Sequence, residues 1–207
     1  MMAWIVFLAA AAAHLYACLT RRETLRRWTK PMLMPLLAVC YALSASAISA
    51  YVVTGLLLGC AGDCLLLKLD TPARFAAGLF AFLLGHVCYI LFMLPQARYP
   101  AWYILIPLCL LYCASGALLY RRLKNHMPAI AKPAIIAYMA VICLMSAYAL
   151  FYLYGGHAVW AFAGSLLFIA SDGILASSIF LQKPKHGNFP IMLAYIAAQT
   201  LLTLGFV

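Results

Sequence analysis

The sequence predicts an all-α, polytopic membrane protein with eight transmembrane helices. The first observation behind this prediction is composition: 68% of the 207 residues are hydrophobic and only 9% are charged. A soluble globular domain carries about a quarter charged residues. The second is that apolar segments of about 20 residues, the length that crosses a bilayer, recur along the whole chain.

The eight expected helices follow one another with little chain between them. They lie near residues 2–19, 31–48, 51–69, 75–94, 101–120, 133–152, 157–180 and 188–206. This spacing leaves no room for a soluble domain, so residues 1–207 are expected to form a single transmembrane domain. The boundary between the second and third helices is marked only by the turn-like stretch SASAISA.

Basic residues mark alternate connections and give the expected orientation. All but one of the 14 lysines and arginines fall at the same end of the helices: Arg21, Arg22, Arg26, Arg27 and Lys30 after the first helix, Lys68 and Arg74 after the third, Arg121, Arg122, Lys124 and Lys132 after the fifth, and Lys183 and Lys185 after the seventh. The positive-inside rule assigns this end to the cytoplasm. Both termini are therefore expected on the non-cytoplasmic side, and the first helix is expected to be retained, because the basic cluster follows it instead of preceding it.

The net charge of +10 needs no nucleic-acid partner. Topology and attraction to anionic lipid head groups account for it. The eight cysteines lie within or at the ends of the expected helices, without histidines at metal-ligand spacing. We interpret them as free packing residues.

Two pairs of similar stretches indicate an internal duplication. GLLLGCAGDCLLL at 55–67 aligns with GSLLFIASDGILA at 164–176, and KPMLMPLLAV at 30–39 aligns with KPAIIAYMAV at 132–141. We infer a four-helix unit present twice, as a parallel 4+4 repeat over about 1–100 and 101–207. The two units would then be related by an axis along the membrane normal. The alternative is chance similarity between Leu- and Ala-rich helices.

The duplication places Asp63 and Asp172 at equivalent positions. At 1.5 Å per residue, each is expected about 9–12 Å from the cytoplasmic end of its helix. A carboxyl group inside a bilayer costs about 2.5–3.5 kcal/mol on insertion scales, so it indicates a functional site. The alternative is that both aspartates only hydrogen-bond neighbouring helices.

Further polar residues are expected near the two aspartates, and they comprise Lys30 at the inner mouth of the second helix, His86 and Tyr89 on one face of the fourth, Ser171 beside Asp172, and Tyr195 and Gln199 on the eighth. Two neighbouring carboxyl groups in a desolvated site can divide into one acid and one carboxylate. That pair suits cleavage of acetal and ether linkages through oxocarbenium-like transition states. A metal held by Asp63, Asp172 and His86 remains an alternative.

The chain resembles the YhhN-like family of integral membrane lysoplasmalogenases over nearly its whole length. The resemblance rests on an ordered set of short motifs: K-P (Lys30, Pro31), G-D (Gly62, Asp63), F-x-x-G-L-x-x-F-L-x-x-H-x-x-Y (Phe75, Gly78, Leu79, Phe82, Leu83, His86, Tyr89), G-x-L-L-F-x-x-S-D (Gly164, Leu166, Leu167, Phe168, Ser171, Asp172) and Y-x-x-A-Q (Tyr195, Ala198, Gln199). Gly173 departs from the pattern, because a small polar residue is expected there.

The resemblance implies an ether hydrolase that splits the vinyl ether bond of a lysoplasmalogen into a fatty aldehyde and glycerophospho-ethanolamine or -choline. Asp63 and Asp172 would serve as acid and stabilising base, in either order, with His86 as a third catalytic residue that, with Tyr89, orients them or the water. Lys30 would meet the lipid phosphate. Ser171, Tyr195 and Gln199 would support the site.

The resemblance also implies the partners and the location of the protein. The expected partners are a lysophospholipid substrate and membrane lipids, without cofactor or nucleic acid, and the expected state is a monomer or homodimer in the bacterial cytoplasmic (inner) membrane. A proton-coupled transporter that uses the same aspartates is the alternative function. A non-catalytic lipid-binding protein and a related lyso-ether substrate also stay open.

Overall fold

A computed structural model describes residues 1–67, 71–181 and 188–207. Within these ranges the chain forms eight α-helices, two short 3-10 helices and no strand, which confirms the predicted all-α class. The helices are α1 (Met2–Leu19), α2 (Glu23–Ser44), α3 (Ala50–Leu65), α4 (Pro72–Met93), α5 (Trp102–Leu123), α6 (Lys132–Tyr154), α7 (Trp160–Phe180) and α8 (Phe189–Gly205), with η1 (Leu94–Gln96) and η2 (Ala129–Ala131). Lys68, Lys183 and Lys185, which the charge pattern uses, lie outside the described residues.

Two helix boundaries differ from the prediction in ways that affect the site. Helix α2 begins at Glu23, eight residues before its expected start, so Pro31 lies inside the helix. Helix α3 ends at Leu65, which places Asp63 in its last turn, about 3 Å along the axis from the helix end. Asp172 lies about 12 Å from the end of α7. The expected 9–12 Å is therefore correct for Asp172 and wrong for Asp63.

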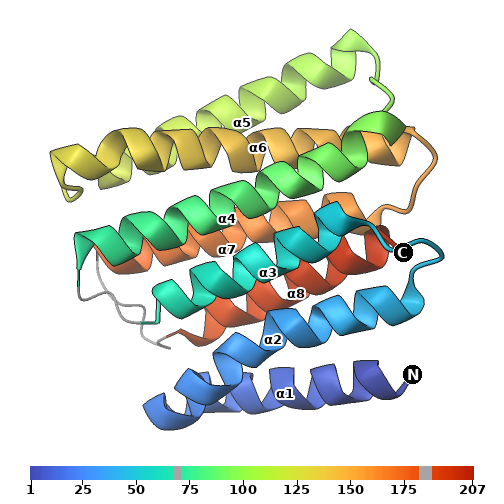
Figure 1. The fold of residues 1–207 in the computed structure, drawn as a ribbon. Coiled ribbons are helices and arrows are strands. Elements are labelled where there is room, and N and C mark those ends of the chain that lie inside the picture. The colour runs from blue at the N-terminus through green and yellow to red at the C-terminus, as the bar shows by residue number, and fades with distance from the viewer. Residues whose placement is uncertain (68–70, 182–187) are drawn as a thin grey trace.

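Successive helices run in opposite directions, and both termini lie at the same end of the bundle (Figure 1). Helices α1 and α5 occupy opposite flanks. Between them, α3 packs closely against α4, α7 packs closely against α8, and α4 also contacts α6. Helices α3 and α7, which carry the two aspartates, are linked within this group through α4 and α6. Which membrane face the termini occupy stays a prediction.

Several of the described helices are suited to lipid. Helices α1, α5, α6 and α7, and α4 together with η1, are long and apolar enough to cross a bilayer, while α3 and α8 are apolar but shorter. Helix α2 is not among them, and its first two turns carry Glu23, Arg26, Arg27 and Lys30. The protein is thus a multi-pass membrane protein, and the count of eight spans stays a prediction.

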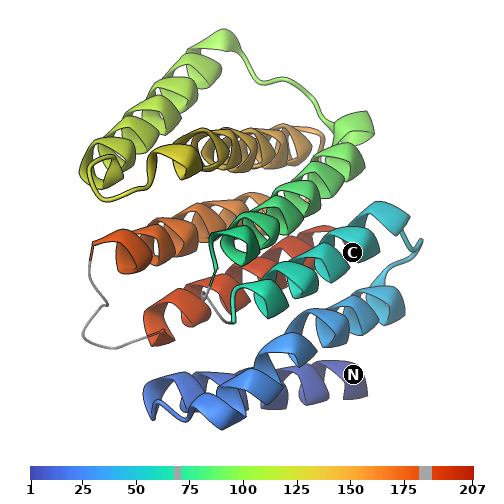
Figure 2. The same ribbon diagram turned by 60° about the vertical axis from the view of Figure 1, so that its left-hand side comes forward.

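The second helix pairs of the two halves, α3–α4 and α7–α8, pack alike, whereas the first pairs, α1–α2 and α5–α6, pack differently. Helix α1 packs along α2, whereas α5 makes few contacts with α6 and buries only Leu123. Figure 2 shows α5 standing apart from its neighbours toward the α4–α5 connection. The predicted 4+4 repeat therefore stays a prediction, and α5 is the element in which the halves differ most.

Candidate active site

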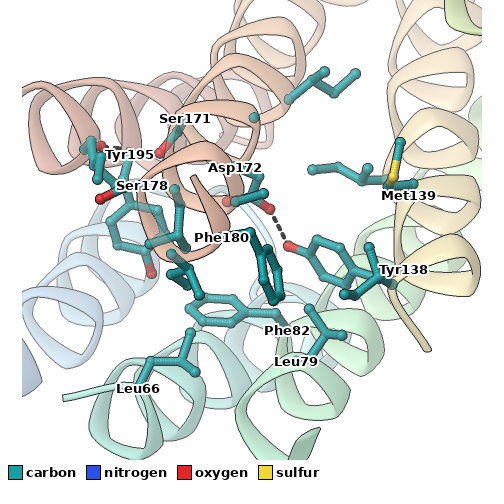
Figure 3. Close-up of a pocket in the computed structure, with 18 of the residues that line it drawn as sticks. Leu66, Leu79, Phe82, Tyr138, Met139, Ser171, Asp172, Ser178, Phe180 and Tyr195 are labelled. Carbon is teal, nitrogen blue, oxygen red and sulfur yellow. Dashed lines mark hydrogen bonds between the residues drawn. The ribbon is translucent and has the colours of Figure 1, made fainter. Parts of the chain in front are cut away.

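A cavity of about 880 Å³ opens among helices α2 to α8, and most of its walls are apolar (Figure 3). Leucine, isoleucine and phenylalanine side chains from α4 to α8 form these walls. The polar groups on its lining include Lys30, Asp63, Tyr138, Asp172 and Tyr195. An apolar cavity with a few convergent polar groups is the usual form of a small-molecule site. Both predicted aspartates line this one cavity.

Asp63 is buried, and each of its carboxylate oxygens has a partner. Lys30 Nζ lies 3.1 Å from Oδ1 in an ion pair, and the Tyr195 hydroxyl donates a hydrogen bond of 2.8 Å to Oδ2. Helix α2 supplies the lysine because it starts early enough to place Lys30 beside α3. A buried charge needs such pairing, so Lys30 and Tyr195 together favour the ionised form of Asp63.

Asp172 has different surroundings. The Tyr138 hydroxyl donates a short hydrogen bond to Asp172 Oδ2, which the dashed line in Figure 3 marks. The same hydroxyl lies 3.1 Å from His86 Nε2. Among the residues that the structure describes, no lysine or arginine forms an ion pair with Asp172. The two aspartates therefore share a cavity but differ in charge environment.

Five of the predicted site residues line the cavity, namely Lys30, Asp63, Ser171, Asp172 and Tyr195. Ser171 also donates to the backbone oxygen of Ile191, which ties α7 to α8. Lys30 is only 8% exposed and is paired with Asp63, and its expected role as a phosphate ligand stays a prediction.

The other three predicted residues, His86, Tyr89 and Gln199, do not line the cavity. The Tyr89 hydroxyl donates to Gln199 Oε1 at 3.0 Å and not to an aspartate, and its expected orienting role stays a prediction. The Tyr89 ring fits where Gly55 has no side chain, since a Cβ there would lie 2.5 Å from the ring. His86 contacts Asp172 only through Tyr138, so it is not placed to touch a substrate.

Tyr138 and Arg26 are among the lining residues that sequence reasoning missed. Tyr138 lies within KPAIIAYMAV, a stretch singled out for its similarity to another stretch and not for its tyrosine. Arg26 precedes Lys30 by one helical turn, so it shares the face of α2 that reaches the cavity. Its guanidinium contacts Glu23 at 2.7 Å. The signals that point to these positions are a tyrosine within an apolar helix and the i, i+4 spacing of two basic residues.

The alternative of a metal held by Asp63, Asp172 and His86 is not supported by the arrangement of these side chains. Within the described ranges, no group of three or more His, Cys, Asp or Glu side chains has metal-ligand spacing. The His86 imidazole faces Tyr138 and the Phe168 ring, whose centre lies 4.7 Å from its own.

Comparison with known proteins places the chain in a family. The model of the YhhN family matches residues 25–206. Human lysoplasmalogenase TMEM86B is 32% identical over 196 residues, which cover 92% of this chain and 80% of the human protein. A lysoplasmalogenase of Mycobacterium bovis is 29% identical over 162 residues, which cover 75% of this chain and 60% of the relative. No solved structure matches the chain. The protein described here belongs to the YhhN family.

Proposed function

We propose that this protein hydrolyses the vinyl ether bond of a lysoplasmalogen, releasing a fatty aldehyde and glycerophospho-ethanolamine or -choline. The observation that carries the proposal is the placing of two aspartates in unlike surroundings on one apolar cavity. The relatives named lysoplasmalogenase support the choice of substrate. The cavity walls suit the alkenyl chain.

The unlike surroundings suggest which aspartate is the acid. The ion pair with Lys30 favours the carboxylate form of Asp63. Asp172 has a neutral hydrogen-bond donor and an apolar cavity around it, so the neutral acid is its favoured form. Two carboxyl groups held in opposite protonation states provide an acid and a base at the same pH.

The reaction then follows in balanced steps. Asp172 transfers its proton to the outer carbon of the vinyl ether, and the electron pair of the double bond forms the new C–H bond. The oxygen-stabilised cation that results is electrostatically stabilised by the Asp63 carboxylate. Asp63 next accepts a proton from a water molecule, whose oxygen bonds to the cationic carbon. The product of this step is a hemiacetal.

Collapse of the hemiacetal returns both aspartates to their starting states. Asp63 gives its proton to the glycerol oxygen as the C–O bond breaks. Asp172, now ionised, removes the proton of the hemiacetal hydroxyl, and the aldehyde forms. The net reaction consumes one water molecule, and the next cycle begins with Asp172 protonated and Asp63 ionised.

The test is aldehyde release from lysoplasmenyl-ethanolamine by the purified protein in detergent. We expect Asp63→Asn and Asp172→Asn each to lower the rate by about 10²- to 10⁴-fold, the usual contribution of an acid or base. Glu23→Gln is the matched control, since Glu23 lies outside the cavity. In deuterated water the aldehyde should carry one deuterium on the carbon next to the carbonyl.

Three results would count against the proposal. Full activity in either folded asparagine variant would remove that aspartate from the mechanism. An aldehyde without deuterium would exclude proton transfer to carbon. A folded wild-type protein that releases no aldehyde would favour the alternative of proton-coupled transport, which is tested by measuring proton movement in vesicles.

A further inference from the structure

A buried histidine next to the cavity has one ring nitrogen without a partner. His86 is 1% exposed, and its Nε2 lies 3.1 Å from the Tyr138 hydroxyl oxygen. Its Nδ1 is the one buried side-chain nitrogen or oxygen, within the described part of the chain, that has no hydrogen-bond partner. The edge-on Phe168 ring packs against the imidazole. Because buried polar atoms are nearly always paired, this exception calls for an explanation.

The unpaired nitrogen limits where the proton on the imidazole can be. If His86 carried its proton on Nδ1, a buried N–H would have no acceptor, and such orphaned donors are rare. With the proton on Nε2, the N–H donates to the Tyr138 oxygen and Nδ1 keeps only a lone pair. The apolar surroundings of Nδ1 therefore favour the Nε2–H form of His86.

This form in turn directs the Tyr138 hydroxyl. Because His86 donates to the Tyr138 oxygen, the single hydroxyl hydrogen of Tyr138 is directed to Asp172 Oδ2. Oδ2 then acts as an acceptor, and a proton on Asp172 is confined to Oδ1. The reverse chain, in which Asp172 donates from Oδ2 to Tyr138 and Tyr138 donates to His86, would place the histidine proton on the unpartnered Nδ1.

We propose that Tyr138 and His86 are positioning residues that hold the transferable proton of Asp172 on Oδ1. This inference rests on the proposed function, in which Asp172 is the acid. The chain from His86 through Tyr138 to Asp172 keeps the same direction whether Oδ1 is protonated or ionised. No donor has to turn during turnover, which is the condition for a preorganised site.

The surroundings of Asp63 show that a tyrosine donor alone does not need a histidine behind it. Tyr195 donates to Asp63 Oδ2, and Lys30 fills the place at Oδ1. Among the residues that the structure describes, Asp172 has no cation partner, and it is the aspartate whose tyrosine contacts a histidine. This arrangement fits a role in directing a proton and not in stabilising a charge.

The experiment measures kcat and KM for aldehyde release with Tyr138→Phe, His86→Met, His86→Gln and the Tyr138→Phe/His86→Met double variant. Glutamine can place its amide nitrogen near the position of His86 Nε2 and always donates there, whereas methionine fills similar volume without a donor. We expect Tyr138→Phe and His86→Met to lower kcat by about 10- to 100-fold, the range usual for such supporting partners, with KM unchanged. His86→Gln should stay within about threefold of wild type, since it retains the donor.

The double variant separates positioning from packing. If His86 acts only through Tyr138, adding His86→Met to Tyr138→Phe causes no further loss of kcat, whereas independent structural effects would multiply. Thermal unfolding in detergent checks that each variant is folded. Should His86→Met fail to fold, Tyr138→Phe alone decides, because an unchanged kcat in that variant overturns the inference.

The possible failures are distinguishable. A wild-type protein without aldehyde release overturns the proposed function and this inference with it. An active wild type in which His86→Gln is as impaired as His86→Met, or in which the two losses multiply, overturns the inference alone. An active wild type with a rescued glutamine variant and a non-additive double variant supports it.

Discussion

Replacing Lys30 with methionine would remove the one cation that the structure shows beside Asp63. Methionine keeps an unbranched side chain of similar length, so the packing of α2 against α3 is retained. Lys30 is 8% exposed and Asp63 is 2% exposed, with Nζ and Oδ1 3.1 Å apart. The substitution leaves a buried carboxyl group whose remaining partner is the Tyr195 hydroxyl.

The magnitude follows from this separation. At 3.1 Å and an effective dielectric constant of about 20, two unit charges attract by about 5 kcal/mol. Removal of one partner of a buried pair costs about 3–5 kcal/mol, because the other charge stays buried without compensation. Asp63 can reduce this cost by taking up a proton, so we expect the lower end, about 3 kcal/mol of unfolding free energy. A protonated Asp63 cannot stabilise the cation, and a similar loss in the transition state lowers kcat/KM by about 100-fold.

Two measurements and two controls make the prediction specific. Thermal unfolding in detergent reports stability, and aldehyde release reports activity. Lys30→Arg keeps the charge and should retain most of the stability. The double variant Lys30→Met/Asp63→Asn removes the unpaired carboxyl group, so it should recover stability without recovering activity. The reasoning is refuted if Lys30→Met unfolds at the wild-type temperature, or if the double variant is no more stable than Lys30→Met.

Two further predictions concern packing and pH. In Gly62→Ala the new Cβ would lie 2.6 Å from the Phe82 ring on the cavity wall, so we expect a loss of about 1–3 kcal/mol in unfolding free energy. Gly173→Ala is the matched control, because a Cβ added there meets no neighbouring residue within 4 Å. This variant should unfold no earlier than wild type. Burial lowers the pKa of His157 below its usual 6.5, and its ring stacks on Tyr152 at 3.8 Å. The folded state thus favours neutral His157, and this contribution to stability is complete above pH 6.5 and decreases as the pH falls below it. Unfolding temperatures measured from about pH 8 to about pH 5 should fall less steeply in His157→Phe than in wild type, and equal slopes would contradict the assignment.

The parts of the site that the sequence predicts are the charged residues that lie within or beside apolar segments. Asp63 and Asp172 are costly in lipid wherever the helices lie, so their presence alone points to a function. Lys30 is predicted from its basic charge beside an apolar segment; it lies within α2 and not at the helix end expected for it, and it lines the cavity. The helical fold class can also be predicted from the sequence, because a long apolar segment in a bilayer has few other ways to form its backbone hydrogen bonds.

The missing parts depend on contacts between helices distant in sequence. Tyr138 and His86 are 52 positions apart, and nothing in either helix specifies that the two side chains meet. The sequence does not predict the early start of α2 either, because the four charged residues before Pro31 are typical of a loop and the proline is typical of a helix start. The helix accommodates them because Glu23 and Arg27 are exposed, Arg26 pairs with Glu23, and the buried Lys30 pairs with Asp63.

The proposed duplication suggests an origin for the unlike surroundings of Asp63 and Asp172. Asp63 and Asp172 are 109 positions apart, and the same offset relates His86 on α4 to Tyr195 on α8. Tyr195 donates directly to the aspartate of the other half, whereas His86 reaches an aspartate only through Tyr138.

The lysines differ between the halves as well. Lys30 pairs with Asp63, but its counterpart Lys132 is the first residue of α6 and does not line the cavity. An ancestral symmetric pair would have placed two carboxyl groups in identical surroundings, where neither is preferred as the acid. On the proposed duplication, a change at one histidine–tyrosine position and the loss of one lysine from the cavity would give the two aspartates the unlike surroundings on which the proposed mechanism depends.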